Sequence, residues 1–256
     1  MNKNKFIKEN LESHINNSIK LFNGQFSFLN IVQQELDNFD NITWLPSPGF
    51  DAETSKKESK NELIKLLNDK QLHSQIQRLL RALTDINEKK IQSNIEHQLI
   101  DNLSNISLNI SKEKKDFKLN LLFLEHNYDS EACFCGFDDP NFKYKLLSGQ
   151  EYLKYDHKQE LFNGVGHFDY TTLINPYLKF EEELGEEKAE RINEALSGGR
   201  YLDEIKKLFL LNGYLGIHLC LSSIKNKIKQ INIPMRDEVF IFGNEHDNGQ
   251  LNIYVL

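Results

Sequence analysis

Apolar residues in the first hundred positions recur every three to five residues, which is the spacing of an amphipathic helix. The first stripe consists of Phe6, Leu11, Ile15, Ile19 and Phe22. After a break at Gly24 the pattern continues through residues 26–39, and Ser55 and Glu58 have the spacing of a capping box ahead of a further helix. Another helix is expected over about 87–104. The pattern predicts a mainly helical region over residues 1–104.

The hydrophobic period changes to two after residue 104. Ile106, Leu108 and Ile110 alternate with polar residues, as in a half-buried strand. Three further short apolar runs lie at 117–126, 132–137 and 142–147, separated by polar turn residues. Four short runs joined by short turns predict a central antiparallel β-meander.

Helices are expected again after residue 148, followed by a closing hairpin. Residues 163–170 contain glycines and are interpreted as a loop, and residues 180–196 as a helical segment that breaks near Gly185. The apolar segment 201–225 predicts a central, buried helix. Asn248-Gly249 is a strong signal for a two-residue hairpin turn. We therefore expect an α+β fold. The mainly helical region 1–104 and an α+β region over 105–256 are expected to pack together as one continuous domain.

Composition and charge narrow the classes of function. Net charge is −7, and residues 1–111 carry 13 basic and 14 acidic side chains against 18 and 24 in residues 112–256. The absence of a basic stripe with interleaved aromatic residues disfavours nucleic-acid binding. The longest apolar run, 208–221, has 14 residues, fewer than the roughly 20 that a membrane span requires. Three cysteines do not make a disulfide framework, so we expect a cytoplasmic protein.

The segment 121–139 gathers the residue types of a metal or catalytic site. If residues 128–131 form the turn, His126 faces Cys133 and Leu124 faces Cys135, so His126 shares a face with both cysteines while Glu125 points the other way. The two cysteines are then about 6.5–7 Å apart at the backbone, which is wide for a chelate, and no second ligand pair is present. We therefore expect neither a metal nor another cofactor.

Catalysis is likewise disfavoured by the surroundings of these groups. A nucleophilic cysteine needs a nearby base and an electropositive setting, whereas Glu125 and several other acids flank Cys133. The enzymatic alternative is a hydrolase or metal-dependent enzyme that uses His126, Cys133 and Cys135, or His167 with Asp169.

Acidic residues at the ends of the two hairpins favour a binding function. In the register set by Asn248-Gly249, Phe242 faces Val255, and Glu245 and Asp247 share the face opposite the apolar residues. The expected partner-binding residues are Glu125, Asp129, Glu131, Asp138, Asp139, Glu245 and Asp247. Such an acidic surface is suited to a basic protein partner.

We therefore expect a cytoplasmic protein that neutralises its partner by occlusion, most simply an immunity protein against a bacterial toxin, with no membrane or nucleic-acid partner. The Glu-rich segment 180–196 is interpreted as a solvated helical face that is also suited to a basic partner. A general interaction domain of a mobile element is the remaining alternative, and it differs only in the identity of the partner.

Overall fold

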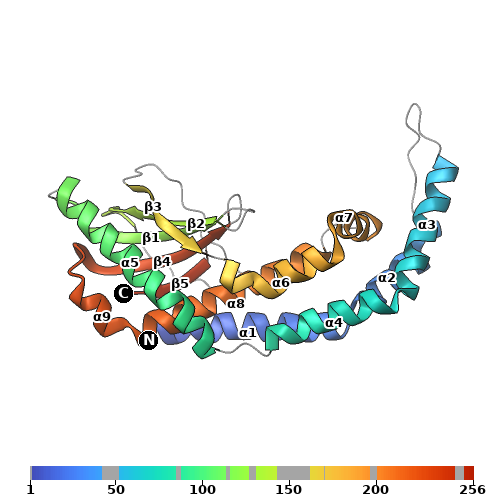
Figure 1. The fold of residues 1–256 in the computed structure, drawn as a ribbon, viewed down its shortest axis with the longest axis horizontal. Coiled ribbons are helices and arrows are strands. Elements are labelled where there is room, and N and C mark those ends of the chain that lie inside the picture. Colours follow the sequence, from blue (N-terminus) through green and yellow to red (C-terminus); the bar gives the residue numbers. More distant parts are fainter. Residues whose placement is uncertain are drawn as a thin grey trace. The chain divides into compact units, whose positions relative to one another are not determined.

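The computed structural model describes residues 2–41, 52–84, 88–113, 116–126, 131–142, 162–169, 171–196, 201–245 and 251–256 (Figure 1). The described helices are α1 (Lys3–Asn23), α2 (Phe28–Asn38), the 3-10 helix η1 (Phe39–Asn41), α3 (Ala52–Asn68), α4 (Lys70–Thr84), α5 (Glu88–Glu113), α6 (Thr171–Leu184), α7 (Glu186–Ala195), α8 (Tyr201–Ser223) and α9 (Lys225–Gln230). The strands are β1 (Leu119–His126), β2 (Glu131–Phe137), β3 (Phe162–Asp169), β4 (Met235–Glu245) and β5 (Leu251–Val255). The α+β class is confirmed.

The chain divides into two compact units. The first contains residues 1–15, 87–174 and 210–256, and it holds the whole sheet. The second contains residues 16–86 and 175–209, and its described part is helical. Each unit thus combines segments that are far apart in the sequence.

The sheet of the first unit is mixed and has the strand order β3-β2-β1-β4-β5. β1 pairs with β2, β2 with β3, and β4 with β5 in antiparallel fashion, whereas β1 and β4 run parallel. All residues of the central strand β1 except Glu125 are buried, as expected of a strand covered on both faces. The predicted meander therefore holds for β1 and β2, and the parallel neighbour of β1 comes from the distant β4.

The predicted strand at 104–110 is wrong, because α5 continues through it to Glu113. Ile106 and Ile110 are both 1% exposed and lie one helical turn apart, whereas Leu108 is 55% exposed. A strand would have placed all three on one face; the helix buries only the pair separated by four residues. The helix that was expected to end near residue 104 is therefore α5, whose buried side continues to Ile110. This helix lies against β3 (Figure 1).

Two other sequence predictions are corrected. Residues 162–169, expected to contain a glycine-bearing loop, form β3 and pair with β2. Ser55 lies inside α3, which begins at Ala52, so it does not begin that helix. The predicted strand at 142–147 falls, except for Phe142, outside the described residues.

Several helix predictions are confirmed. The break at Gly24 separates α1 from α2, whose N-cap Ser27 accepts a hydrogen bond from the Asn30 backbone N–H. Gly185 separates α6 from α7 with a φ of 79°, a conformation that favours glycine. The apolar segment 201–225 forms α8, in which Ile205, Ile217 and Cys220 are fully buried. None of the helices in the described ranges is both long and apolar enough to cross a membrane.

Candidate functional site

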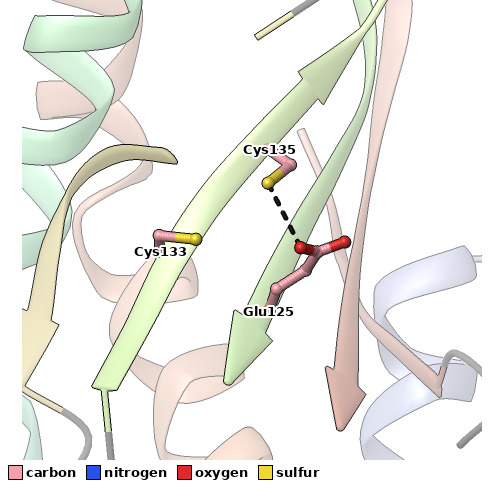
Figure 2. Close-up of side chains that lie close together, drawn as sticks. All are labelled: Glu125, Cys133 and Cys135. Atoms are coloured by element: carbon pink, nitrogen blue, oxygen red, sulfur yellow. Dashed lines mark hydrogen bonds between the residues drawn. The ribbon is translucent and has the colours of Figure 1, made fainter. Parts of the chain in front are cut away.

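The β1–β2 hairpin brings Glu125 to the two cysteines (Figure 2). Its register places His126 on the other face of the sheet. Glu125 faces Cys133, and His126 faces Ala132. The predicted register was wrong by one residue, and a one-residue change exchanges the faces of every side chain in a strand. The expected group of His126, Cys133 and Cys135 therefore does not form.

Glu125, Cys133 and Cys135 instead form a compact group, which we call the thiol–carboxylate cluster. One possible ligand atom from each residue lies within 4.8 Å of the other two. The Cys135 thiol donates a hydrogen bond of 3.5 Å to Oε2 of Glu125. Cys135 is buried, while Glu125 and Cys133 are half-buried. The separation of the two cysteines at the backbone therefore does not keep the ligand atoms apart, because the side chains bring them within 4.8 Å of one another.

The same cluster changes the ionisation of Cys133. The side-chain hydrogen bond between Cys133 and Cys135 is the largest cause acting on the pKa of Cys133 and lowers it below its usual value, although burial and the Glu125 carboxylate both act to raise it. The acidic setting expected to disfavour a thiolate is present, but it is outweighed by the neighbouring thiol. Cys133 therefore ionises more readily than an ordinary cysteine.

His126 has a structural environment on the opposite face of the sheet. Its side chain is buried, and its Nε2 lies 2.6 Å from the hydroxyl of Tyr214 on α8. The ring of Tyr214 covers Gly243 on β4, where a Cβ atom would come within 2.3 Å of it. This face of the sheet is thus tightly packed around His126.

The acids expected at the hairpin tips lie at opposite ends of the sheet. Because β1 and β4 are parallel, Glu245 is paired with His126, next to Glu125 and near Glu131 at the start of β2. Asp138 follows the other end of β2, where Arg236 donates to its carboxylate at 2.6 Å. About six strand residues, or roughly 20 Å, separate these ends, so the acids that the structure describes do not all belong to one patch.

Asp139 is engaged within the fold, since its backbone N–H donates to Oδ1 of Asn120 at 2.8 Å and its carbonyl accepts from Nδ2 of Asn120 at 2.6 Å. Asp129 and Asp247 fall outside the described residues. A role in partner binding for the seven acids stays a prediction.

The closing hairpin is confirmed, but its register differs from the predicted one. Phe240 faces Val255, and after a β-bulge between Ile241 and Phe242, Gly243 faces Leu251. The register implied by the turn at Asn248-Gly249 had placed Phe242 opposite Val255. The turn residues lie outside the described ranges, and a bulge adds an offset that a turn motif does not encode.

A second candidate site is a groove in the helical unit, along α6 and α7, which we call the acidic groove. It has a volume of about 960 Å³ and is lined by Leu178, Glu181, Glu182, Gly185, Glu186, Ala189, Glu190, Asn193 and Glu194. Five of the seven glutamates in segment 180–196 therefore face one hollow. The side-chain oxygen of Asn193 is buried there without a hydrogen-bond partner.

The ion pairs of these two helices leave the groove negative. The two remaining glutamates, Glu183 and Glu187, pair with Arg78 and Arg191. Lys188 pairs with Asp69, at 2.6 Å. Among the residues that the structure describes, Glu182, Glu186, Glu190 and Glu194 have no ion-pair partner. The cations that offset this segment in the sequence are therefore engaged elsewhere.

The Glu-rich segment 180–196 was recognised in the sequence, but its residues were not among the predicted partner-binding residues. The signal that was available is the spacing of Glu182, Glu186, Glu190 and Glu194, which recur every four residues. Such spacing places side chains along one side of a helical segment. The assignment of Lys188 to Asp69, however, depends on a contact across 119 residues that no local pattern reveals.

Comparison of the chain with protein-family models, curated proteins and solved structures finds no match.

Proposed function

We propose that this chain is a cytoplasmic binding protein that neutralises a basic partner protein by occlusion, in the manner of an immunity protein against a bacterial toxin. The observation that carries the proposal is the acidic groove, in which four exposed glutamates have no cation of their own. Neighbouring carboxylates without counter-charges repel one another, and a basic partner relieves that repulsion when it binds.

The shape and lining of the groove favour a protein segment as its occupant. Leu178 and Ala189 supply apolar surface between the carboxylates, so a helix that carries lysines or arginines beside small apolar residues would fit it. Charge then guides the encounter, and burial of the apolar surface adds affinity.

Occlusion is the simplest way for such a complex to neutralise a toxin. Basic residues that bind phosphates or an acidic substrate in a toxin would be covered by the glutamates of the groove, and the substrate would be displaced. The first form of the enzymatic alternative, a joint site of His126, Cys133 and Cys135, lacks a comparable observation, because His126 lies on the opposite face of the sheet from the two cysteines.

The test is protection of a growing cell. The partner to be used is the product of the reading frame next to this gene, expressed from an inducible promoter with and without this chain. The proposal expects that the neighbouring product stops growth and that this chain restores it. A neighbouring product without toxicity, or toxicity that this chain does not relieve, would contradict the immunity role. Relief that occurs without a complex between the two proteins would contradict occlusion.

A further inference from the structure

We propose that the thiol–carboxylate cluster of Glu125, Cys133 and Cys135 is a binding site for a borderline-soft divalent cation, of which Zn²⁺ is the physiological example. Two strands contribute the ligands, with Glu125 on β1 and both cysteines on β2 (Figure 2). This site lies in the sheet-containing unit and is independent of the acidic groove.

The spacing of the ligand atoms is close to that of a tetrahedral zinc site. With Zn–S bonds of about 2.3 Å and Zn–O bonds of about 2.0–2.2 Å, a tetrahedron places sulfur about 3.8 Å from sulfur and about 3.6 Å from oxygen. Sγ of Cys135 is already 3.5 Å from Oε2 of Glu125, and all three ligand atoms lie within 4.8 Å of one another. The three ligand atoms thus already lie near the spacing of a tetrahedral site.

The strands that carry the ligands are held firmly by aromatic packing on the same face. Phe123, which faces Cys135 across the hairpin, stacks on Phe242 and meets Phe137 edge-on, at ring-centre distances of 5.4 and 5.2 Å. All three rings are buried. A rigid support of this kind fixes the ligand positions before the cation arrives, which lowers the entropic cost of binding.

The electrostatics of the cluster also favour a cation. The Cys135 thiol donates its proton to the Glu125 carboxylate in a hydrogen bond of 3.5 Å, so a proton already lies between two of the ligand atoms where a cation would replace it. On binding, the two thiols lose their protons to water, two S–M²⁺ bonds and one O–M²⁺ bond form, and no electron is transferred. Three ligand charges of −1 then surround a charge of +2, and the repulsion among them is offset.

The donor set selects the class of cation. Thiolates bind Zn²⁺ and related thiophilic ions, whereas Ca²⁺ and Mg²⁺ take oxygen ligands. Three protein ligands leave one tetrahedral position for water or for a ligand from a partner. Glu125 and Cys133 are half-buried, so the cation can reach the site from solvent.

Spectroscopic titration of the full chain with Co²⁺, under conditions that keep the thiols reduced, tests this site. Tetrahedral cobalt with thiolate ligands shows strong visible ligand-field bands and thiolate charge-transfer bands. We expect these bands to saturate at about one equivalent and to disappear when Zn²⁺ is added. Elemental analysis of the zinc-loaded chain should then give about one zinc per molecule.

Four variants identify the ligands. Cys133→Ser and Cys135→Ser should each abolish the charge-transfer bands. Loss of a residue that only hydrogen-bonds to a metal ligand weakens metal affinity by ~10–100-fold. Loss of a direct ligand in Glu125→Gln should therefore weaken Zn²⁺ affinity by at least this much. Cys220→Ala is the matched control, because Cys220 is buried in α8 and its burial raises its pKa to about 12; this variant should bind the metal as the parent does.

Three results would overturn the site. The first is absence of the cobalt bands in the parent chain with free thiols shown by titration. The second is an equal loss of binding in Cys220→Ala and in the ligand variants. The third is retention of full affinity in both Glu125→Gln and Cys133→Ser, with thermal unfolding confirming that the variants are folded.

Discussion

Tyr214 shows how single residues determine the packing of the sheet. Its ring lies over Gly243 on β4, and its hydroxyl is 2.6 Å from Nε2 of His126 on β1. One side chain of α8 therefore contacts two neighbouring strands, and the position on β4 must be glycine for the ring to approach so closely. His126 is thereby accounted for as a packed, hydrogen-bonded residue.

Gly243→Ala is expected to destabilise the protein, because the added Cβ would lie 2.3 Å from the Tyr214 ring. Overpacking of this kind costs about 1–3 kcal/mol, measurable as a lower midpoint in urea unfolding. Gly136→Ala is the matched control in the same sheet, since its Cβ would meet only the end of the flexible Leu119 side chain, at 2.9 Å. A Gly136→Ala loss equal to or larger than the Gly243→Ala loss would contradict this account.

His218 makes stability depend on pH. Burial is the main cause that lowers its pKa, and its Nδ1–H donates to the carbonyl of Ile253 at 2.7 Å. The folded chain therefore binds this proton less readily than the unfolded chain, whose histidine has a pKa of about 6.5. As pH falls below that value the unfolded state gains the proton first, and stability decreases.

The contribution of His218 is isolated by the variant His218→Asn, which keeps a hydrogen-bond donor but does not titrate. Unfolding free energies measured between neutral and mildly acidic pH should fall more steeply for the parent chain than for this variant. Equal slopes for the two proteins would show that His218 does not contribute to the pH dependence.

Among the elements, Asp69 connects three helices of the second unit. It lies between α3 and α4, accepts a hydrogen bond from the Leu72 backbone N–H at 2.9 Å as the N-cap of α4, and pairs with Lys188 of α7 at 2.6 Å. The hydrogen bond from Lys188 is the largest cause that lowers the pKa of Asp69. This contact occupies the lysine of α7 that would otherwise offset the glutamates of the acidic groove.

Substitutions at Asp69 separate its two roles. Asp69→Ala removes both the cap and the ion pair and should cost about 1–2 kcal/mol, mostly from the cap. Asp69→Asn keeps a capping oxygen and loses the charge, so its cost should be clearly smaller. Chemical denaturation measures both. Equal losses would show that the ion pair, and not the cap, is the dominant contribution.

Element types were more predictable than their partners. The helices of residues 1–41, the break at Gly185 and the buried helix α8 follow from periodicity and glycine, and the structure confirms them. The strand predicted at 104–110 is wrong because Ile106, Leu108 and Ile110 have the period of two that is typical of a strand. Ile106 and Ile110 equally continue the apolar side of the preceding helix. The hairpin at 121–139 was recognised as a hairpin, but a one-residue error in register replaced Glu125 by His126 beside the cysteines.

At the scale of the whole molecule, the features that position the candidate sites are contacts between distant segments. The parallel pairing of β1 with β4 joins residues more than 110 positions apart, and it places Glu245 and Asp138 at opposite ends of one sheet. The negative charge of the acidic groove depends on pairs such as Lys188 with Asp69. Local sequence patterns do not indicate which distant segments pair. The acidic residues can therefore be identified in the sequence, but which of them lie close together cannot be predicted from it.

The central claim, that the acidic groove binds a basic partner, is tested most directly by affinity and its salt dependence. The groove variant combines Glu182→Gln, Glu186→Gln and Glu190→Gln. The control combines Glu9→Gln, Glu53→Gln and Glu58→Gln, which makes the same change in net charge on exposed residues outside the groove. Dissociation constants for the product of the neighbouring reading frame are measured for the parent and both variants across a range of salt concentrations.

If each of the three groove carboxylates contributes about 0.5–0.9 kcal/mol, in the upper part of the range for exposed ion pairs, the groove variant should bind roughly 10-fold to 100-fold more weakly at low salt. Its salt dependence should also be flatter than that of the parent, while the control should remain within about a factor of three of the parent because its charges lie away from the contact. Equal affinities and equal salt slopes for the groove variant and the control would contradict the claim.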